Sequence, residues 1–109
     1  YTSRQSRVGE VGYLIRSSET SKGVATEATA RILEVAFDEL ALHRVVLRIA
    51  VGNRGSERVA EKLGFTREGV LRQELQVNGV WMDHSIWGLL EDEYHELKPS
   101  FAAAGWLTA

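Results

Sequence analysis

The hydrophobic pattern of this chain changes its period several times. Apolar and aromatic residues crowd residues 8–15 as in a strand, and apolar residues then recur at helical spacing from Val24 to Leu40. Residues 44–51 return to the two-residue period of a strand, with alternate side chains expected on a buried face. The pattern therefore predicts a strand, a long helix and a second strand.

The second half of the chain starts with a break at Gly52. Asn53 or Ser56 can cap a helix that runs to Leu63, and Gly64 supplies the left-handed residue that commonly ends a helix. Residues 52–64 are therefore predicted to hold a turn and a short second helix.

Two long strands are predicted over residues 65–77 and 80–90. The Asn78-Gly79 dipeptide lies between them, and this dipeptide strongly favours a two-residue hairpin turn. We therefore expect the two strands to be antiparallel neighbours.

A last helix is predicted over residues 91–97. We expect Pro99 to end it, because proline cannot donate a helical hydrogen bond. The first two strands flank a helical crossover, so they should be parallel neighbours. The fold class predicted is α/β, with a mixed sheet of the α+β kind.

Composition limits the function classes further. The chain has 109 residues, enough for one domain, and a net charge of −2, which argues against direct nucleic-acid or membrane binding. It has no cysteine, which excludes disulfides, thiolate metal sites and a cysteine nucleophile, and which fits a cytoplasmic protein. His43 and His95 match no metal-ligand spacing, so no metal is expected.

The start of the chain is unusual. It opens with Tyr1 rather than methionine, and residues 1–7 are polar, without a core pattern. We expect residues 1–7 to be an irregular lead-in, and the chain to be a fragment or the ordered part of a longer protein.

A candidate anion site lies between the first strand and the first helix. Helix N-termini carry unpaired N–H groups and a partial positive charge, which favour phosphate. Gly23 and Ala25 would let an anion approach the backbone, and Lys22 adds a cation. The spacing is not that of a P-loop, and a glycine is common in any turn of this kind.

These residues carry a family resemblance. Residues 10–15 followed by 22–28 resemble the fourth strand and pyrophosphate loop of the GCN5-related N-acetyltransferases. Gly23 and Ala25 match the loop pattern Gln/Arg-x-x-Gly-x-Gly/Ala, whereas Thr20 departs from it. Further segments resemble the branch that acetylates alanine or serine N-termini of ribosomal proteins, namely residues 42–45, 53–56, 59–65, 68–69 and 78–84.

The resemblance implies a single partial domain over residues 1–109. Residues 8–94 would form the acetyl-CoA-binding core and residues 95–109 a C-terminal tail. The family has three further strands and two helices before the strand at Val8, so that strand is expected to have an unpaired edge and uncovered apolar faces.

The resemblance also implies where acetyl-CoA binds. Its pantetheine arm would pair with the first strand, where this strand splays from the second, and its pyrophosphate would sit on the amides that open the first helix. A backbone N–H of the first strand would polarise the thioester carbonyl. The implied cofactor-binding residues are Tyr13, Leu14, Ile15, Lys22, Gly23, Val24, Ala25, Thr26, Asn53, Ser56 and Arg58.

The proton donor implied for the leaving thiolate is Ser56, which matches a family serine. Ser56 and Asn53 could equally serve as helix caps. Arg58 could reach the nucleotide end of the cofactor. The simpler interpretation is that Arg58 only lies on the solvated face of its helix.

The base is left open between two glutamates. Glu10, on the first strand, could act through water. The family glutamate falls at Leu75, so Glu74, one residue earlier, should point to the opposite face of its strand unless a bulge turns it. A protein α-amine, with a pKa of about 7.7 to 8.0, does not require a strong base.

Two other groups of residues have plainer interpretations. Asp83, His84 and Ser85 are consecutive in a strand, so they should form a polar strand face near the acceptor groove rather than a catalytic triad. Trp81 and Trp87 share a strand face, and we expect both to be packing residues.

The function expected is transfer of an acetyl group to a primary amine by direct attack. The acceptor expected is the N-terminal amine of a ribosomal or other protein, and polyamines and aminoglycosides are alternative acceptors. A different alternative is an inactive module that only binds acyl-CoA. The protein could be a monomer or a homodimer.

Overall fold

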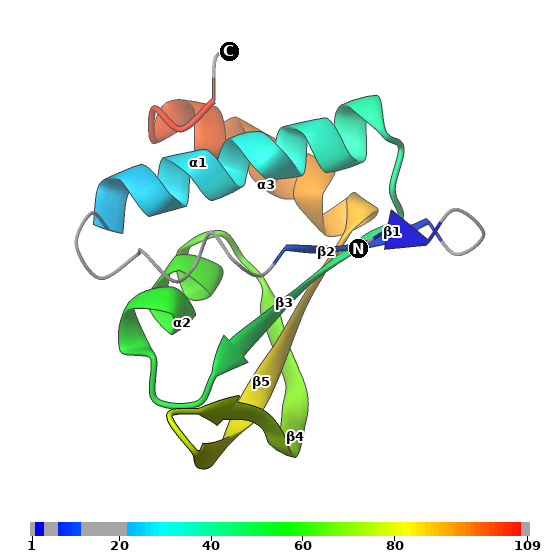
Figure 1. The fold of residues 1–109 in the computed structure, drawn as a ribbon. Coiled ribbons are helices and arrows are strands. Elements are labelled where there is room, and N and C mark those ends of the chain that lie inside the picture. Colours follow the sequence, from blue (N-terminus) through cyan, green and yellow to red (C-terminus); the bar gives the residue numbers. More distant parts are fainter. Residues whose placement is uncertain (1, 4–6, 12–21, 108–109) are drawn as a thin grey trace.

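The computed structural model describes residues 2–3, 7–11 and 22–107, whose strands form a mixed sheet (Figure 1). In this part of the chain the sheet has five strands in the order β1-β2-β3-β5-β4. The strands are β1 Thr2–Ser3, β2 Val8–Val11, β3 Arg44–Ala50, β4 Thr66–Val77 and β5 Val80–Leu90.

The pairing of the strands confirms the predicted mixed α/β class. β2 and β3 are parallel, from Val8 opposite Arg44 to Val11 opposite Leu47, and the other pairs are antiparallel. The hairpin turn between β4 and β5 has positive φ at Asn78 (50°) and Gly79 (80°), as a type I′ turn requires.

The helices are α1 Lys22–Glu34, α2 Arg54–Lys62 and α3 Glu91–Ala103. A π-helical turn, Val35–Glu39, extends α1, so the predicted helix through this region is confirmed with a widened last turn. The amide of Leu40 donates to the carbonyl of Val35, five residues earlier. No helix in these described ranges is both long and apolar enough to cross a membrane.

One hydrophobic core joins the three helices to one face of the sheet. The alternate residues Val45, Leu47 and Ile49 of β3 are buried on that face, as their period predicted. α1 contributes Ala30 and Leu33, among others. The opposite face of the sheet, which we call the open face, has no helix on it in the described residues (Figure 1).

The last helix corrects one prediction. α3 does not end before Pro99 but continues to Ala103 with Pro99 inside it. Proline leaves one helical hydrogen bond unmade, at a cost of about 3 kcal/mol or more. Phe101 and Leu107, beyond the proline, are buried in the core, and burying two such side chains at about 1.5 to 3 kcal/mol each offsets that cost.

The start of the chain corrects a second prediction. Residues 1–7 are not irregular throughout, because β1 pairs with β2, Thr2 opposite Gly9 and Ser3 opposite Val8. The edge of β2, expected to be unpaired, is therefore covered at these two residues. A strand held by backbone hydrogen bonds at a sheet edge needs no apolar pattern, so the polar composition gave no signal.

Candidate active site

The edge of β3 next to β2 is the first feature of the site. Within the described residues, β2 pairs with β3 from Val8 opposite Arg44 to Val11 opposite Leu47, and β3 itself runs to Ala50. On its other edge β3 stays paired with β5 throughout, ending with Ala50 opposite His84. The predicted cofactor residues Tyr13, Leu14 and Ile15 lie outside the described residues.

The predicted pyrophosphate segment forms the first turn of α1. The helix begins at Lys22, so the backbone N–H groups of residues 22–25 have no partner four residues earlier within the helix. Ala25 packs against the core and Thr26 is buried. These positions fit the predicted phosphate site, whose ligand role stays a prediction.

The start of α2 lies directly after the end of β3. Asn53 is the N-cap residue, and its Oδ1 accepts a hydrogen bond from the amide of Ser56 at 3.2 Å. The capping interpretation is therefore confirmed for Asn53. The Ser56 side chain is fully buried, and its role as a proton donor stays a prediction.

Arg58 lies on the exposed side of α2, apart from these residues. It borders an open hollow of about 540 Å³ in which arginines and glutamates alternate along the helix. The other lining residues are Arg54, Glu57, Glu61, Phe65, Arg67 and Trp87. Its contact with a nucleotide stays a prediction.

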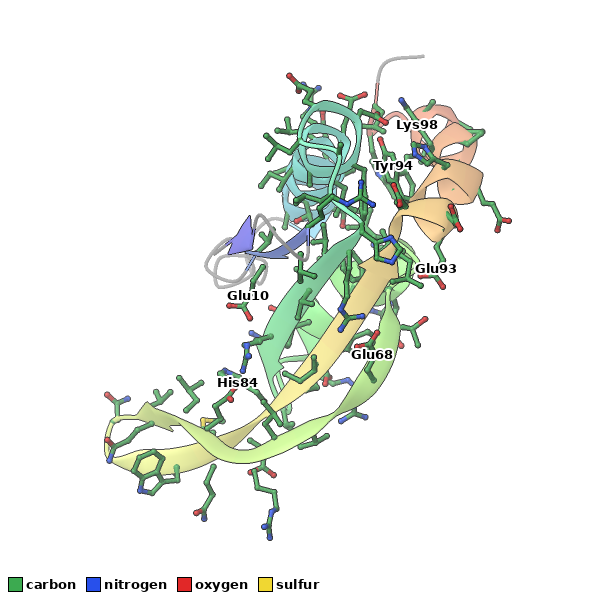
Figure 2. All side chains as sticks on the ribbon, turned by 90° about the vertical axis from the view of Figure 1, so that its right-hand side faces the viewer. Glu10, Glu68, His84, Glu93, Tyr94 and Lys98 are labelled. Atoms are coloured by element: carbon green, nitrogen blue, oxygen red, sulfur yellow. The ribbon has the colours of Figure 1, made fainter. Side chains whose placement is uncertain are left out.

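A charged cluster on the open face brings the two predicted bases together. Figure 2 labels two of its members, Glu10 and His84. Arg48, on β3, donates from Nε to Glu10 of β2 and from Nη1 to Glu74 of β4. His84, on β5, contacts Glu74 through its Nδ1 at 2.8 Å. We call these four residues the Arg48 cluster; they come from four different strands.

A bulge in β4 turns Glu74 toward this cluster. Leu71 lies opposite His84, but Leu75 lies opposite Met82, so four positions along β4 match two along β5. Within the bulge, Gln73 has a φ of 50°, and its amide donates to Asp83 Oδ1 at 2.9 Å. The irregularity that Glu74 required is therefore present, with a side-chain acceptor for its freed amide.

The charges of the cluster support one another. The Arg48 guanidinium, followed by the hydrogen bond from His84, lowers the pKa of Glu74 below the ordinary glutamate value. Hydrogen bonds to Glu74 and Glu10 raise the pKa of Arg48. Glu74 is therefore a stable carboxylate at neutral pH and a weak proton acceptor on its own.

A second ion pair lies on the same face. Arg44 of β3 forms a two-pronged contact with Glu68 of β4, including Nη1 to Oε2 at 2.7 Å. The pair crosses β5 at Gly88, where an added Cβ would lie 2.2 Å from Glu68 Oε2. Glu68 also sits at a register shift, between Arg67 and Gly69.

Asp83, His84 and Ser85 have separate partners, as expected of a strand rather than a triad. Ser85 is buried on the helix-covered face, where its hydroxyl donates to the Ile49 carbonyl at 3.1 Å and accepts from Trp87 at 2.8 Å.

The two tryptophans of β5 differ from each other. Trp87 is buried, which confirms a packing role, whereas the prediction for Trp81 is wrong, because its side chain is 56% exposed near the hairpin turn. The core ends before the hairpin does, so a shared strand face did not mean shared burial.

The structure thus brings together Glu10 with Glu74, and Asn53 with Ser56. Sequence reasoning did not assign Arg48 or His84 to the site. The strand period of β3 gave a usable signal for Arg48, because it alternates with buried residues and so had to face the other side of the sheet. No group of three or more metal-ligating side chains occurs where the structure describes the chain.

The fold matches known acetyltransferases. A family model for the acetyltransferase (GNAT) domain matches residues 1–66, more than half of the chain. A crystal structure of a probable acetyltransferase has a TM-score of 0.77 and 40% identity, covering 84% of this chain and 52% of that one. The mixed α/β fold is therefore part of the GNAT fold.

Two curated relatives show the degree of sequence identity. The putative ribosomal N-acetyltransferase YdaF of Bacillus subtilis is 40% identical over 92 residues, 84% of this chain and 50% of the relative. The spermidine N(1)-acetyltransferase of Vibrio cholerae is 32% identical over 94 residues, 78% of this chain and 54% of the relative. The chain spans about half the length of the curated relatives it matches.

Because the matched residues contain the predicted cofactor loop and the strands beside it, the resemblance seen in the sequence is confirmed. The chain belongs to the acetyltransferase (GNAT) domain family.

Proposed function

We propose that this protein transfers the acetyl group of acetyl-CoA to a primary amine, most simply the N-terminal amine of a ribosomal or other protein. The observation that carries the proposal is the start of α1 at Lys22, within the family-matched residues 1–66. It supplies backbone N–H donors where the family resemblance puts the diphosphate of the cofactor.

The reaction follows from positioning two reactants. With the diphosphate on α1, the family resemblance puts the thioester between β2 and β3, toward the end of β3 that leads into α2. An amine held on the open face could then attack the acetyl carbon directly, with most of the rate coming from proximity and orientation.

Ser56 is proposed to protonate the leaving thiolate. It lies in the first turn of α2, four residues after the turn that ends β3, and Asn53 holds its backbone through the cap. Its burial would keep water away from the hydroxyl, so a proton given to sulfur would not be lost to solvent.

A polyamine is the second candidate acceptor. The Arg48 cluster contains two carboxylates and one guanidinium, so it offers negative charge to a second ammonium group. The name of the Vibrio cholerae relative supports this alternative, and that of YdaF supports a protein N-terminus.

The experiment that tests the proposal measures thiol release from acetyl-CoA in the presence of alanine- or serine-starting peptides, spermidine or an aminoglycoside. Calorimetry with coenzyme A runs in parallel. Turnover with one acceptor class supports the proposal and names the class. Coenzyme A binding without thiol release from any acceptor would favour a binding module, and no binding at all would overturn the proposal.

A further inference from the structure

His84 has one ring nitrogen in use and one available. Its Nδ1 contacts Glu74 Oε1 at 2.8 Å, and its side chain is 15% exposed. Its Nε2 makes no hydrogen bond to any residue that the structure describes. Because an ionised carboxylate only accepts hydrogen bonds, Nδ1 must carry the hydrogen, and in the neutral ring Nε2 then carries a lone pair.

Glu74 is itself held in place from the other side. Arg48 contacts both Glu74 and Glu10, so the carboxylate that orients His84 is anchored to β3 and, through it, to β2. The charged groups that face His84 are therefore Glu74 from β4, with Arg48 and Glu10 behind it. Asp83, its neighbour on β5, instead accepts from the bulge amide of Gln73.

His84 lies beside the end of β3 that leads into α2. It is opposite Ala50, the last residue of β3, and Asn53, three residues further on, is the N-cap of α2. Its side chain is on the open face, with Glu10 (Figure 2). The available nitrogen is thus on the open face, where the proposed acceptor amine would be held.

We propose that His84 Nε2 accepts the proton of the acceptor ammonium, while Glu74 holds the opposite ring nitrogen and Arg48 fixes Glu74. His84 is then the catalytic base, and Glu74 and Arg48 are positioning residues. The inference rests on the proposed acetyl transfer.

The proton and electron balance is simple. One proton passes from the acceptor ammonium to Nε2, which gives a neutral amine and an imidazolium. The amine lone pair forms the N–C bond to the acetyl carbon, and the C–S bond breaks with its electron pair on sulfur. Ser56 gives its proton to the thiolate, so coenzyme A leaves as a thiol, and the second proton of the nitrogen restores the Ser56 hydroxyl. The imidazolium releases its proton to solvent.

The first test replaces His84 by asparagine, whose amide can still donate to Glu74 but has no basic nitrogen. His43→Asn is the matched control, because His43 Nδ1 contacts Glu91 Oε1 at 3.0 Å at the other end of β3. We expect His84→Asn to lower kcat/KM for an α-amine acceptor about 100-fold at pH 7. We expect His43→Asn to keep the wild-type value.

The pH profile separates a base from a structural residue. The wild type should keep its rate below the pKa of the free amine, about 7.7 to 8.0, because Nε2 takes the proton of the bound ammonium. The rate of His84→Asn should instead rise as the free amine loses its proton, with a midpoint at about pH 8. Its loss of activity relative to the wild type should therefore shrink to less than about 10-fold at pH 9. A defect that is the same at every pH would overturn the assignment, because a misfolded or loosened site has no such recovery.

A tautomer measurement adds a second criterion. Nitrogen-15 NMR of the imidazole should show the Nδ1–H form of His84 in the wild type, and Glu74→Gln should reduce that preference. An Nε2–H form in the wild type would overturn the inference. If the wild type turns over and His84→Asn is equally active, the inference alone fails; if the wild type releases no thiol with any acceptor, the proposed function fails and takes the inference with it.

Discussion

Two glutamates at irregularities in β4 each contact an arginine of β3, and the two contacts differ. At the first, Glu68 forms a closed, two-pronged pair with Arg44 across Gly88. At the second, Glu74 shares Arg48 with Glu10 and also contacts His84. One glutamate therefore belongs to a closed ion pair, and the other belongs to a cluster that includes the available ring nitrogen of His84.

The difference lies in how the partners are used. The recorded contacts of Glu68 go to one arginine, so that pair holds β3 and β4 together across β5. Glu74 divides its contacts between a cation that keeps it ionised and a histidine that it orients. The role of each ion pair thus depends on what else its carboxylate contacts.

The largest effect should come from removing the second bulge. Deleting Arg72 and Gln73 makes Leu71 to Leu75 match β5 as a regular strand, which turns Glu74 to the opposite face. We expect acetyl transfer to fall at least about 100-fold, to the level of His84→Asn. Steady-state kinetics measure the loss, and an unchanged far-ultraviolet circular dichroism spectrum checks the fold.

A smaller effect should come from neutralising each glutamate in turn. Glu74→Gln keeps the shape but removes the charge that stabilises an imidazolium, so kcat/KM at pH 7 should fall about 10-fold. Glu68→Gln is the matched control and should leave kcat/KM within about twofold. Equal losses in the two variants would remove the distinction between the two sites.

Filling Gly88 should sharpen the structural side of the comparison. A Cβ at this position would lie 2.5 Å from Arg44 Nη1 and closer still to Glu68, so Gly88→Ala must displace the pair. We expect the free energy of unfolding to fall by about 1 kcal/mol, with activity retained. Urea unfolding measures the change, and Gly69→Ala, where an added Cβ meets nothing within 4 Å, is the control.

The smallest effect should appear in acid. Arg44 lowers the pKa of Glu68, as Arg48 lowers that of Glu74. A folded pKa below the unfolded value stabilises the protein above about pH 4.3, and this contribution is lost as the pH falls through the lowered pKa. Both carboxylates are partly exposed, so Glu68→Gln should cost no more than about 0.5 kcal/mol at pH 7. The urea midpoints of the variant and the wild type should converge as the pH falls through the lowered pKa of Glu68.

Local signals predicted much of the fold. The Asn78-Gly79 turn, the Asn53 cap and the alternation of β3 each depend on residues a few positions apart, and all three are confirmed. The crossover rule then gave the parallel pairing of β2 and β3. The missed features, β1 and the continuation of α3 through Pro99, depend on contacts with distant residues.

The site was less predictable for a related reason. Perfect alternation places Glu74 away from Leu75, and a bulge is a matter of register with another strand, which one strand's sequence does not specify. Arg48 and His84 become site residues only when four strands are side by side. The candidate glutamates could be named from the sequence, but their common partner could not.

The π-helical turn at the end of α1 changes the direction in which the side chains of the last turn point. One extra residue in a helical turn rotates everything after it by about 100°, since a turn holds 3.6 residues. Phe37 stacks on Tyr94 of α3 at 4.8 Å between ring centroids, and Asp38 accepts from the Tyr94 hydroxyl at 2.9 Å and from Lys98 at 2.7 Å. The helix thus contacts α2 from α1 and α3 from its last turn. Deleting one residue from the π-helical turn should therefore break the contacts with α3 and leave the start of α1 in place.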